Sequence, residues 1–175
     1  MRIYLFFSAL FLVYSCSEER KSDLPSSDGL PDQESWGVTI IMTHEGYIRA
    51  KVNSDHLKKF DEKEYIVLDG NVVVDFFDLD ENHTSTLFSN KSEINEKSND
   101  MLAIGNVIAK SDSGITLFTE RLHWIAEDEK LFTKDSIMIT TLDKDTLFGK
   151  GFESNAELEN WRILNPSGVT GSEIH

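Results

Sequence analysis

Apolar and polar residues alternate along six stretches of the chain between residues 37 and 141. These stretches are rich in Val, Ile, Thr and aromatic residues, and clusters of Asn, Asp, Gly, Ser and Lys separate them. Alternation with a period of two, bounded by turn residues, is typical of short β-strands. Only residues 54–60 and 155–160 have a pattern that suits a helix. The sequence therefore predicts an all-β domain, with strands in residues 37–43, 46–54, 65–77, 101–110, 114–126 and 135–141.

A sequence repeat organises these strands into units. Thr-Leu-Phe begins at Thr86, Thr116 and Thr146, thirty residues apart each time, and an acidic turn follows each copy. Each unit thus contains a strand that leads in, a turn and a strand that leads out. One such unit cannot bury its apolar face alone, so neighbouring units must stack. We expect stacked β-hairpins with a repeat of roughly 30 residues.

The alternation also assigns residues to an inner and an outer face. Asp75 should face water, so Val74 and Phe76 should point inward. The interior should be lined by Val, Leu, Ile, Ala and Trp. Such a lining suits both a packed core and a groove for an apolar ligand, and the sequence does not separate the two. The candidate groove residues are Val72, Val74, Phe76, Leu87, Val107, Ala109, Leu117, Leu122, Trp124, Ile137 and Ile139.

The N-terminal residues have the layout of a secretory signal. Arg2 is followed by an apolar run over residues 3–13, which is shorter than the roughly twenty residues of a membrane-spanning helix. Residues 13–16, Val-Tyr-Ser-Cys, resemble a bacterial lipobox, and Cys16 is the only cysteine. We expect residues 1–15 to be a lipoprotein signal peptide and Cys16 to be lipidated; two or more acyl chains would anchor it firmly to a membrane. The alternative is an ordinary signal with an incidental cysteine.

The rest of the chain is expected to form one domain behind a tether. Residues 16–35 are polar and read as a flexible tether, residues 36–168 as the β-domain and residues 169–175 as a tail. The formal net charge is −14, and no basic patch is visible. Nucleic acid is therefore not expected as a partner.

Motifs for catalysis or metal binding do not emerge from the sequence. None of the five histidines is paired at a metal-ligand spacing, and there is no nucleophile elbow, phosphate loop or dinucleotide fingerprint. Residues 78–82, Asp-Leu-Asp-Glu-Asn, lack the glycine and the final glutamate of a calcium loop and suit a hairpin turn. We predict no catalytic residue, metal or cofactor, and a protein that is not an enzyme.

Three segments, residues 45–77, 101–139 and 147–163, resemble the LptC family of periplasmic lipopolysaccharide-export components. The resemblance implies an extended, incompletely closed, OstA-like β-jellyroll. The chain departs from the better-known members of the family in one respect, because Cys16 would replace their N-terminal helix as the membrane anchor. The matching residues are Gly46, Gly105, Asn106, Val107, Gly114, Leu117, Thr119, Glu120, Leu122, Trp124, Gly149 and Gly151.

The resemblance implies a carrier of lipopolysaccharide. It would bind lipid A acyl chains in the apolar groove, receive them from inner-membrane ABC transporter permeases, and pass them to a periplasmic bridge β-jellyroll. The bridge would dock on the C-terminal edge strand near Trp161 to Leu164. The protein would face the periplasm, lipid-anchored in the inner or, alternatively, the outer membrane. The competing function is a surface-exposed binding lipoprotein for a carbohydrate or a protein.

Overall fold

The computed structural model describes residues 29–167. The chain divides into two units, Met1–Leu30 and Pro31–His175, and the second unit contains every strand of the described part. The predicted signal peptide, Cys16, most of the predicted tether and the C-terminal tail lie outside the described residues.

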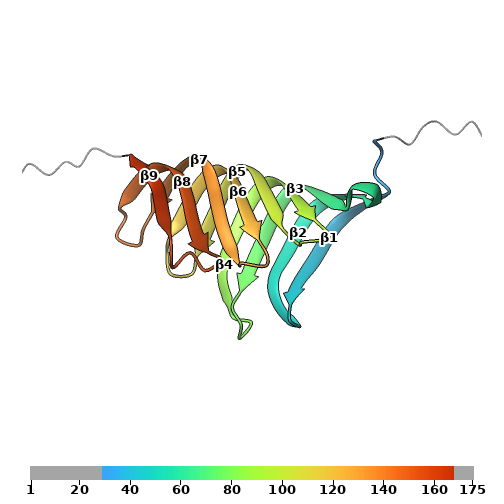
Figure 1. Cartoon of the computed structure of the whole chain (residues 1–175), viewed down its shortest axis with the longest axis horizontal. Coiled ribbons are helices and arrows are strands. Elements are labelled where there is room, and N and C mark those ends of the chain that lie inside the picture. The colour runs from blue at the N-terminus through green and yellow to red at the C-terminus, as the bar shows by residue number, and fades with distance from the viewer. Residues whose placement is uncertain (1–28, 168–175) are drawn as a thin grey trace, which may run out of the picture. The chain divides into compact units, whose positions relative to one another are not determined.

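Nine strands form a single antiparallel sheet in which each strand pairs with the next along the chain. Figure 1 shows the strands side by side, from β1 at one end of the sheet to β9 at the other. Within the described residues β1 pairs only with β2 and β9 only with β8, so the sheet is not closed. The predicted all-β class and incompletely closed β-jellyroll are confirmed. The strands are β1 (Gln33–His44), β2 (Tyr47–Phe60), β3 (Tyr65–Phe77), β4 (His83–Asn95), β5 (Met101–Ser111), β6 (Thr116–Ile125), β7 (Lys130–Thr140), β8 (Thr146–Asn155) and β9 (Arg162–Ser167).

Neither of the two short stretches whose pattern suited a helix is helical. Residues 54–60 belong to β2, where they pair with β1 on one side and β3 on the other, and residues 156–160 form a turn after β8. Pairing on both sides outweighs the weak helical pattern of so short a segment. β1 begins at Gln33, so the last residues assigned to the tether belong to the sheet. Residues 78–82 form the turn between β3 and β4, as predicted.

The sheet is folded across the middle of its strands. The register shifts within the strands in six successive pairs, from β2–β3 to β7–β8. In β3 and β5 the bend consists of Gly70-Asn71 and Gly105-Asn106, with φ between +47° and +79°. Glycine adopts this left-handed backbone freely and asparagine tolerates it. The Gly-Asn pairs of the sequence repeat therefore mark the line of bending, which we call the crease.

Hydroxyl side chains satisfy backbone groups at the crease. Ser54, Ser89 and Thr119 occupy the bend of β2, β4 and β6, and all three are buried. The Ser54 hydroxyl donates to the carbonyl of Asp69, and the Thr119 hydroxyl donates to that of Ser136. A bulge interrupts the backbone hydrogen bonds between neighbouring strands. The side-chain hydroxyls therefore replace some of the hydrogen bonds that are lost at the bend.

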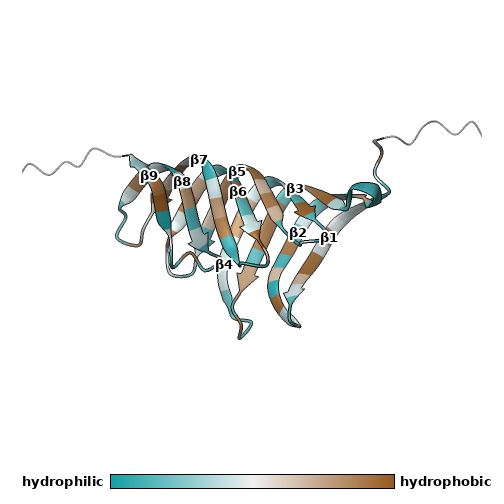
Figure 2. Ribbon diagram, viewed as in Figure 1, coloured by the Kyte–Doolittle hydropathy of each residue, from teal (hydrophilic) through white to brown (hydrophobic). Residues whose placement is uncertain are grey.

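The two halves of the folded sheet face each other as two layers. Phe76 and Trp124 come from strands that are not neighbours, yet their rings meet edge to face with centroids 5.3 Å apart. Apolar and polar residues alternate along the strands, so that each layer turns one apolar face inward (Figure 2). The first layer comprises residues 47–54, 72–77, 83–89, 107–111, 116–119, 136–140 and 146–150. The second comprises residues 56–60, 65–69, 91–95, 101–104, 122–125, 130–133 and 152–155.

Candidate functional site

The residues predicted to line the interior all lie on the inner faces of the two layers. Each has an exposed fraction between 0 and 4%, and all belong to one apolar cluster. The predicted inward orientation of Val74 and Phe76 is therefore confirmed, and so is the outward orientation of Asp75. The binding of a lipid by these residues stays a prediction. The set is Val72, Val74, Phe76, Leu87, Val107, Ala109, Leu117, Leu122, Trp124, Ile137 and Ile139.

Side chains fill the interior in this structure. Val72, Leu117, Leu122 and Ile139 have no solvent exposure, and the rings of the two layers are in contact. Of the two alternatives that the sequence left open, the structure therefore presents the packed arrangement. An apolar ligand could enter only if the layers moved apart, because a close-packed interior has no spare volume for it.

The layers meet opposite the crease along a line of hairpin turns, which we call the seam. Here the buried Ser85 hydroxyl donates to the carbonyl of Ala156 at 2.6 Å. The Ser111 hydroxyl donates to the carbonyl of Glu157 at 2.9 Å. Neutral hydrogen bonds of this kind contribute about 0.5–1.5 kcal/mol each. The polar bonds across the seam can therefore open at moderate cost, whereas the crease is covalently continuous.

Arg49, a residue that the sequence analysis did not single out, makes a third contact across the seam. It lies near the start of β2 with only 5% of its side chain exposed, and its Nη2 is 2.6 Å from Glu129 Oε2 of the second layer. Both Arg49 and Ala50 are buried, so strict alternation fails at this point and the pattern gave no signal for it. Hydrogen bonds from Asn82 chiefly lower the pKa of Asp78, and the charge of Arg49 adds to this effect.

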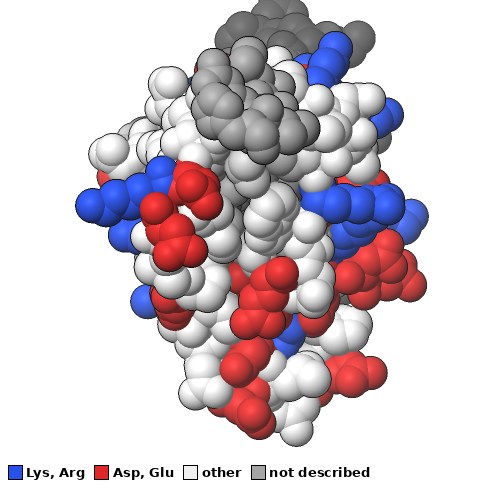
Figure 3. Space-filling model, turned by 90° about the vertical axis from the view of Figure 1, so that its left-hand side faces the viewer, with Lys and Arg blue, Asp and Glu red and all other residues white. Residues whose placement is uncertain are grey.

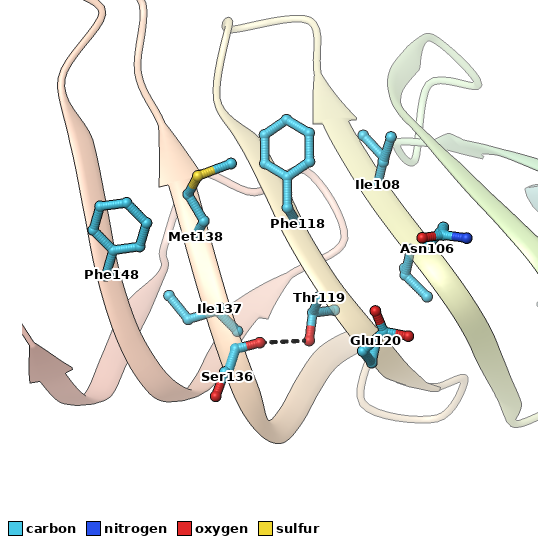
Figure 4. A pocket seen from close by; sticks show the side chains of 10 residues that line it. Asn106, Ile108, Phe118, Thr119, Glu120, Ser136, Ile137, Met138 and Phe148 are labelled. Carbon is cyan, nitrogen blue, oxygen red and sulfur yellow. Dashed lines mark hydrogen bonds between the residues drawn. The ribbon is translucent and has the colours of Figure 1, made fainter.

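An apolar row crosses the outer face of the first layer. Its members are direct cross-strand partners on successive strands, and they include the Phe of every Thr-Leu-Phe copy. A depression of about 450 Å³ lies over the row between β5 and β8 (Figure 4). The repeat thus places its Leu and its Phe on opposite faces of the sheet. The row consists of Val73, Phe88, Ile108, Phe118, Met138 and Phe148.

The C-terminal edge of the sheet is β9, the strand predicted to dock a partner. Trp161 packs against the core just before the strand begins, while Leu164 is 43% exposed. Arg162 bonds Glu153 of β8 at 2.7 Å, and this bond lowers the pKa of Glu153. Pro166 lies within β9, opposite Gly149 of β8, and is tolerated there because an edge strand needs no amide on its open side. At this end acidic groups gather in the lower half of the view, with Lys and Arg at the sides (Figure 3).

Within residues 29–167 no group of three or more His, Cys, Asp or Glu side chains could hold a metal ion. Among the same residues we find no helix with the length and apolar character needed to cross a membrane.

The chain resembles known proteins in both its sequence and its fold. Residues 3–170 match the model of the family described as lipopolysaccharide-assembly, LptC-related. No curated protein sequence matches the chain. Among solved structures the chain is similar to LptH from Pseudomonas aeruginosa, described as the LptA-homologous periplasmic component of the conserved lipopolysaccharide transport device. The TM-score is 0.53 at 14% identity, over 71% of this chain and 86% of that chain. At this identity the likeness shows the fold alone.

Proposed function

The chain belongs to the LptC-related family of lipopolysaccharide-assembly proteins, and from that premise we propose that it shelters lipid A acyl chains between the two layers of its sheet. The family and the fold make it a transport component rather than an enzyme. The observation that carries the proposal is the interior itself. One apolar cluster extends from β1 to the turn after β8, inside a sheet that is open at both edges.

The energetics favour such a shelter. Each methylene removed from water contributes about 0.8 kcal/mol, so an acyl chain gains strongly from entering the interior. To enter, it must separate the layers and replace contacts such as that between Phe76 and Trp124. The seam is the natural opening, since few polar bonds cross it. Loading and seam opening are therefore one process, with the crease as the hinge.

Transfer to the next carrier would use the open edges. An unpaired edge strand can accept a strand from another chain by β-augmentation. We assign the β9 edge near Trp161 to Leu164 to the periplasmic bridge β-jellyroll, and the β1 edge to the inner-membrane ABC transporter permeases. The direction of transport would come from ATP hydrolysed by the ABC transporter to which these permeases belong.

The anchor is the lipid on Cys16, which would hold the protein in the cell envelope facing the periplasm. The support is the lipobox-like Val-Tyr-Ser-Cys of residues 13–16. We favour the inner membrane, because the cargo is received there.

Site-specific photocrosslinking tests the shelter. A photoreactive residue at Val74, which faces inward with no exposure, should capture lipopolysaccharide in cells. The matched control is Asp75, the next residue of β3, which faces outward. Equal capture at both positions would point to a surface-binding protein. Failure of a folded Val74 variant to capture the lipid would refute the proposal.

A further inference from the structure

We propose that a pocket at the β1 end of the interior binds the carbonyl oxygen of an acyl chain, through Arg49 and Trp124. The inference rests on the proposed function and adds the chemistry by which one part of the lipid is recognised. The pocket has a volume of about 110 Å³ and lies between the first strands and the turns of the second layer. Its lining includes Met42, Arg49, Trp124 and Glu127.

Hydrogen-bond donors without acceptors mark this pocket. Arg49 Nε, Arg49 Nη1 and Trp124 Nε1 are buried and have no partner among the residues that the structure describes. Arg49 is 5% exposed and Trp124 3%, and the two come from different layers. Buried polar groups in proteins are almost always paired. All three orphaned groups are N–H donors, so the missing partner must supply acceptor oxygen.

The charges around the pocket favour a neutral acceptor over an anion. The guanidinium of Arg49 is already paired with Glu129 at 2.6 Å. Glu127 lines the same pocket, and Asp78 is close enough to interact with the charge of Arg49. An incoming phosphate would therefore meet at least as many carboxylates as cations. A neutral oxygen can accept from one of the free N–H groups of Arg49 without that repulsion.

The size and position of the pocket select the acyl linkage. The pocket is small, about 110 Å³ against about 450 Å³ for the depression on the outer face, which suits a small polar group better than a sugar ring. Met42 and Trp124, on its inner side, belong to the apolar core. The group that fits is the one joining an apolar chain to a polar head. An ester or amide carbonyl has two lone pairs and lies at that boundary.

Two nonionic detergents with the same chain length supply the test. Sucrose monolaurate has an acyl ester, whereas dodecyl maltoside joins chain and disaccharide through a glycosidic oxygen and has no carbonyl group. Each is titrated, below its micelle concentration, into the full chain labelled with ¹⁵N. We expect sucrose monolaurate to shift the Arg49 Nε–H and Trp124 Nε1–H resonances downfield with one shared affinity. Dodecyl maltoside should bind less tightly and leave both resonances near their free positions.

Variants separate this site from general apolar binding. Arg49→Lys keeps the charge that pairs with Glu129 but loses the planar set of N–H donors. It should weaken the binding of sucrose monolaurate about tenfold. Trp124→Phe keeps an aromatic ring against Phe76 but removes the indole N–H, and should also weaken binding. Arg121→Lys is the matched control, because Arg121 is paired with Asp135 on the outer surface. This variant should leave the binding of sucrose monolaurate unchanged. Far-UV circular dichroism verifies folding.

The outcomes are decisive. Dodecyl phosphate, which has the same chain and an anionic head, is titrated as a third probe. The carbonyl site is overturned if both nonionic detergents cause equal shifts, if dodecyl phosphate binds more tightly than sucrose monolaurate, or if no probe causes a response. If Val74 crosslinking still captures lipopolysaccharide in that case, only this inference fails. If Val74 captures nothing, the proposed function fails first.

Discussion

Replacing Gly149 with alanine should release the last strand of the sheet. A Cβ atom at this position would overlap Ile163 Cγ2 and lie 2.8 Å from the backbone oxygen of Asn165. Separations below 3 Å cannot persist, and the second contact is with backbone. Side-chain rotation alone therefore cannot relieve the overlap, and β9 must move away from β8. The φ angle of Gly149 is not in the left-handed region, so close contact is the cause and not backbone strain.

The magnitude follows from what β9 buries. Overpacking of this kind costs about 1–3 kcal/mol. If the strand detaches instead, the protein loses the burial of Ile163, which is half-buried against the core, or roughly 1 kcal/mol. For a domain of this size each kcal/mol lowers Tm by about 2–4 °C, so we expect a fall of roughly 5 °C. The amides of β9 should exchange faster, while those of β5 and β6 stay protected.

Thermal unfolding and hydrogen exchange measure both effects. Gly46→Ala is the control, because Gly46 has φ +90° and nothing lies within 4 Å of an added Cβ. It should cost about 1 kcal/mol of backbone strain and leave β9 protected. In an Ile163→Ala background the cost of Gly149→Ala should shrink, because one of the two overlaps is gone. Unchanged protection of β9, or strictly additive costs, would refute the reasoning.

Three further predictions follow from the crease, the surface and the seam. Gly105→Ala should destabilise the fold by about 1–2 kcal/mol in urea, because φ is +79° and the added Cβ would lie 3.0 Å from a neighbouring side chain. Arg121 lowers the pKa of Asp135, so Asp135 stabilises the fold above its ordinary pKa of 3.8, and this contribution is lost as pH falls through the lower folded value. Asp135→Asn should thus be slightly less stable at neutral pH, and acid titration should show the difference vanish in strong acid. Ser85→Ala removes the bond to Ala156 and should cost about 1 kcal/mol while speeding lipid capture in the crosslinking assay.

Much of the fold could be predicted from local patterns. Alternation identified six of the nine strands of the described part, those that became β1, β2, β3, β5, β6 and β7, but it did not mark β4 and β8 as strands. It assigned Val74 and Asp75 to the correct faces, because a period of two fixes the side of every residue while the strand is regular. The spacing of the Thr-Leu-Phe copies identified the stacking. The sequence did not reveal that the Gly-Asn pairs bend the strands, since a bend in one strand needs a matching bend in its neighbours.

The residues that alternation missed lie where the strand is irregular or where the outer face is unusual. Arg49 and Ala50 are adjacent and both buried, which a regular strand does not allow. Phe118 and Phe148 were visible in the repeat, and the inward position of Leu117 implies that Phe118 faces outward, but alternation within one strand does not say which outward residues of different strands lie side by side. Cross-strand register, which is not local, turns them into a continuous row.

A filled interior suits a carrier better than a permanently open trough. An open apolar trough would expose its surface to water at about 25 cal/mol per Å², and it would hold acyl chains with their whole transfer free energy. An interior that closes on itself recovers part of that free energy when the lipid leaves. Contacts such as that between Phe76 and Trp124 then compete with the cargo for the same space. The competition lowers the affinity without removing the specificity, because polar groups at the seam still select what may replace them. A component that must pass its cargo on needs this property, since a site that held the lipid too tightly would stop the chain of transfer.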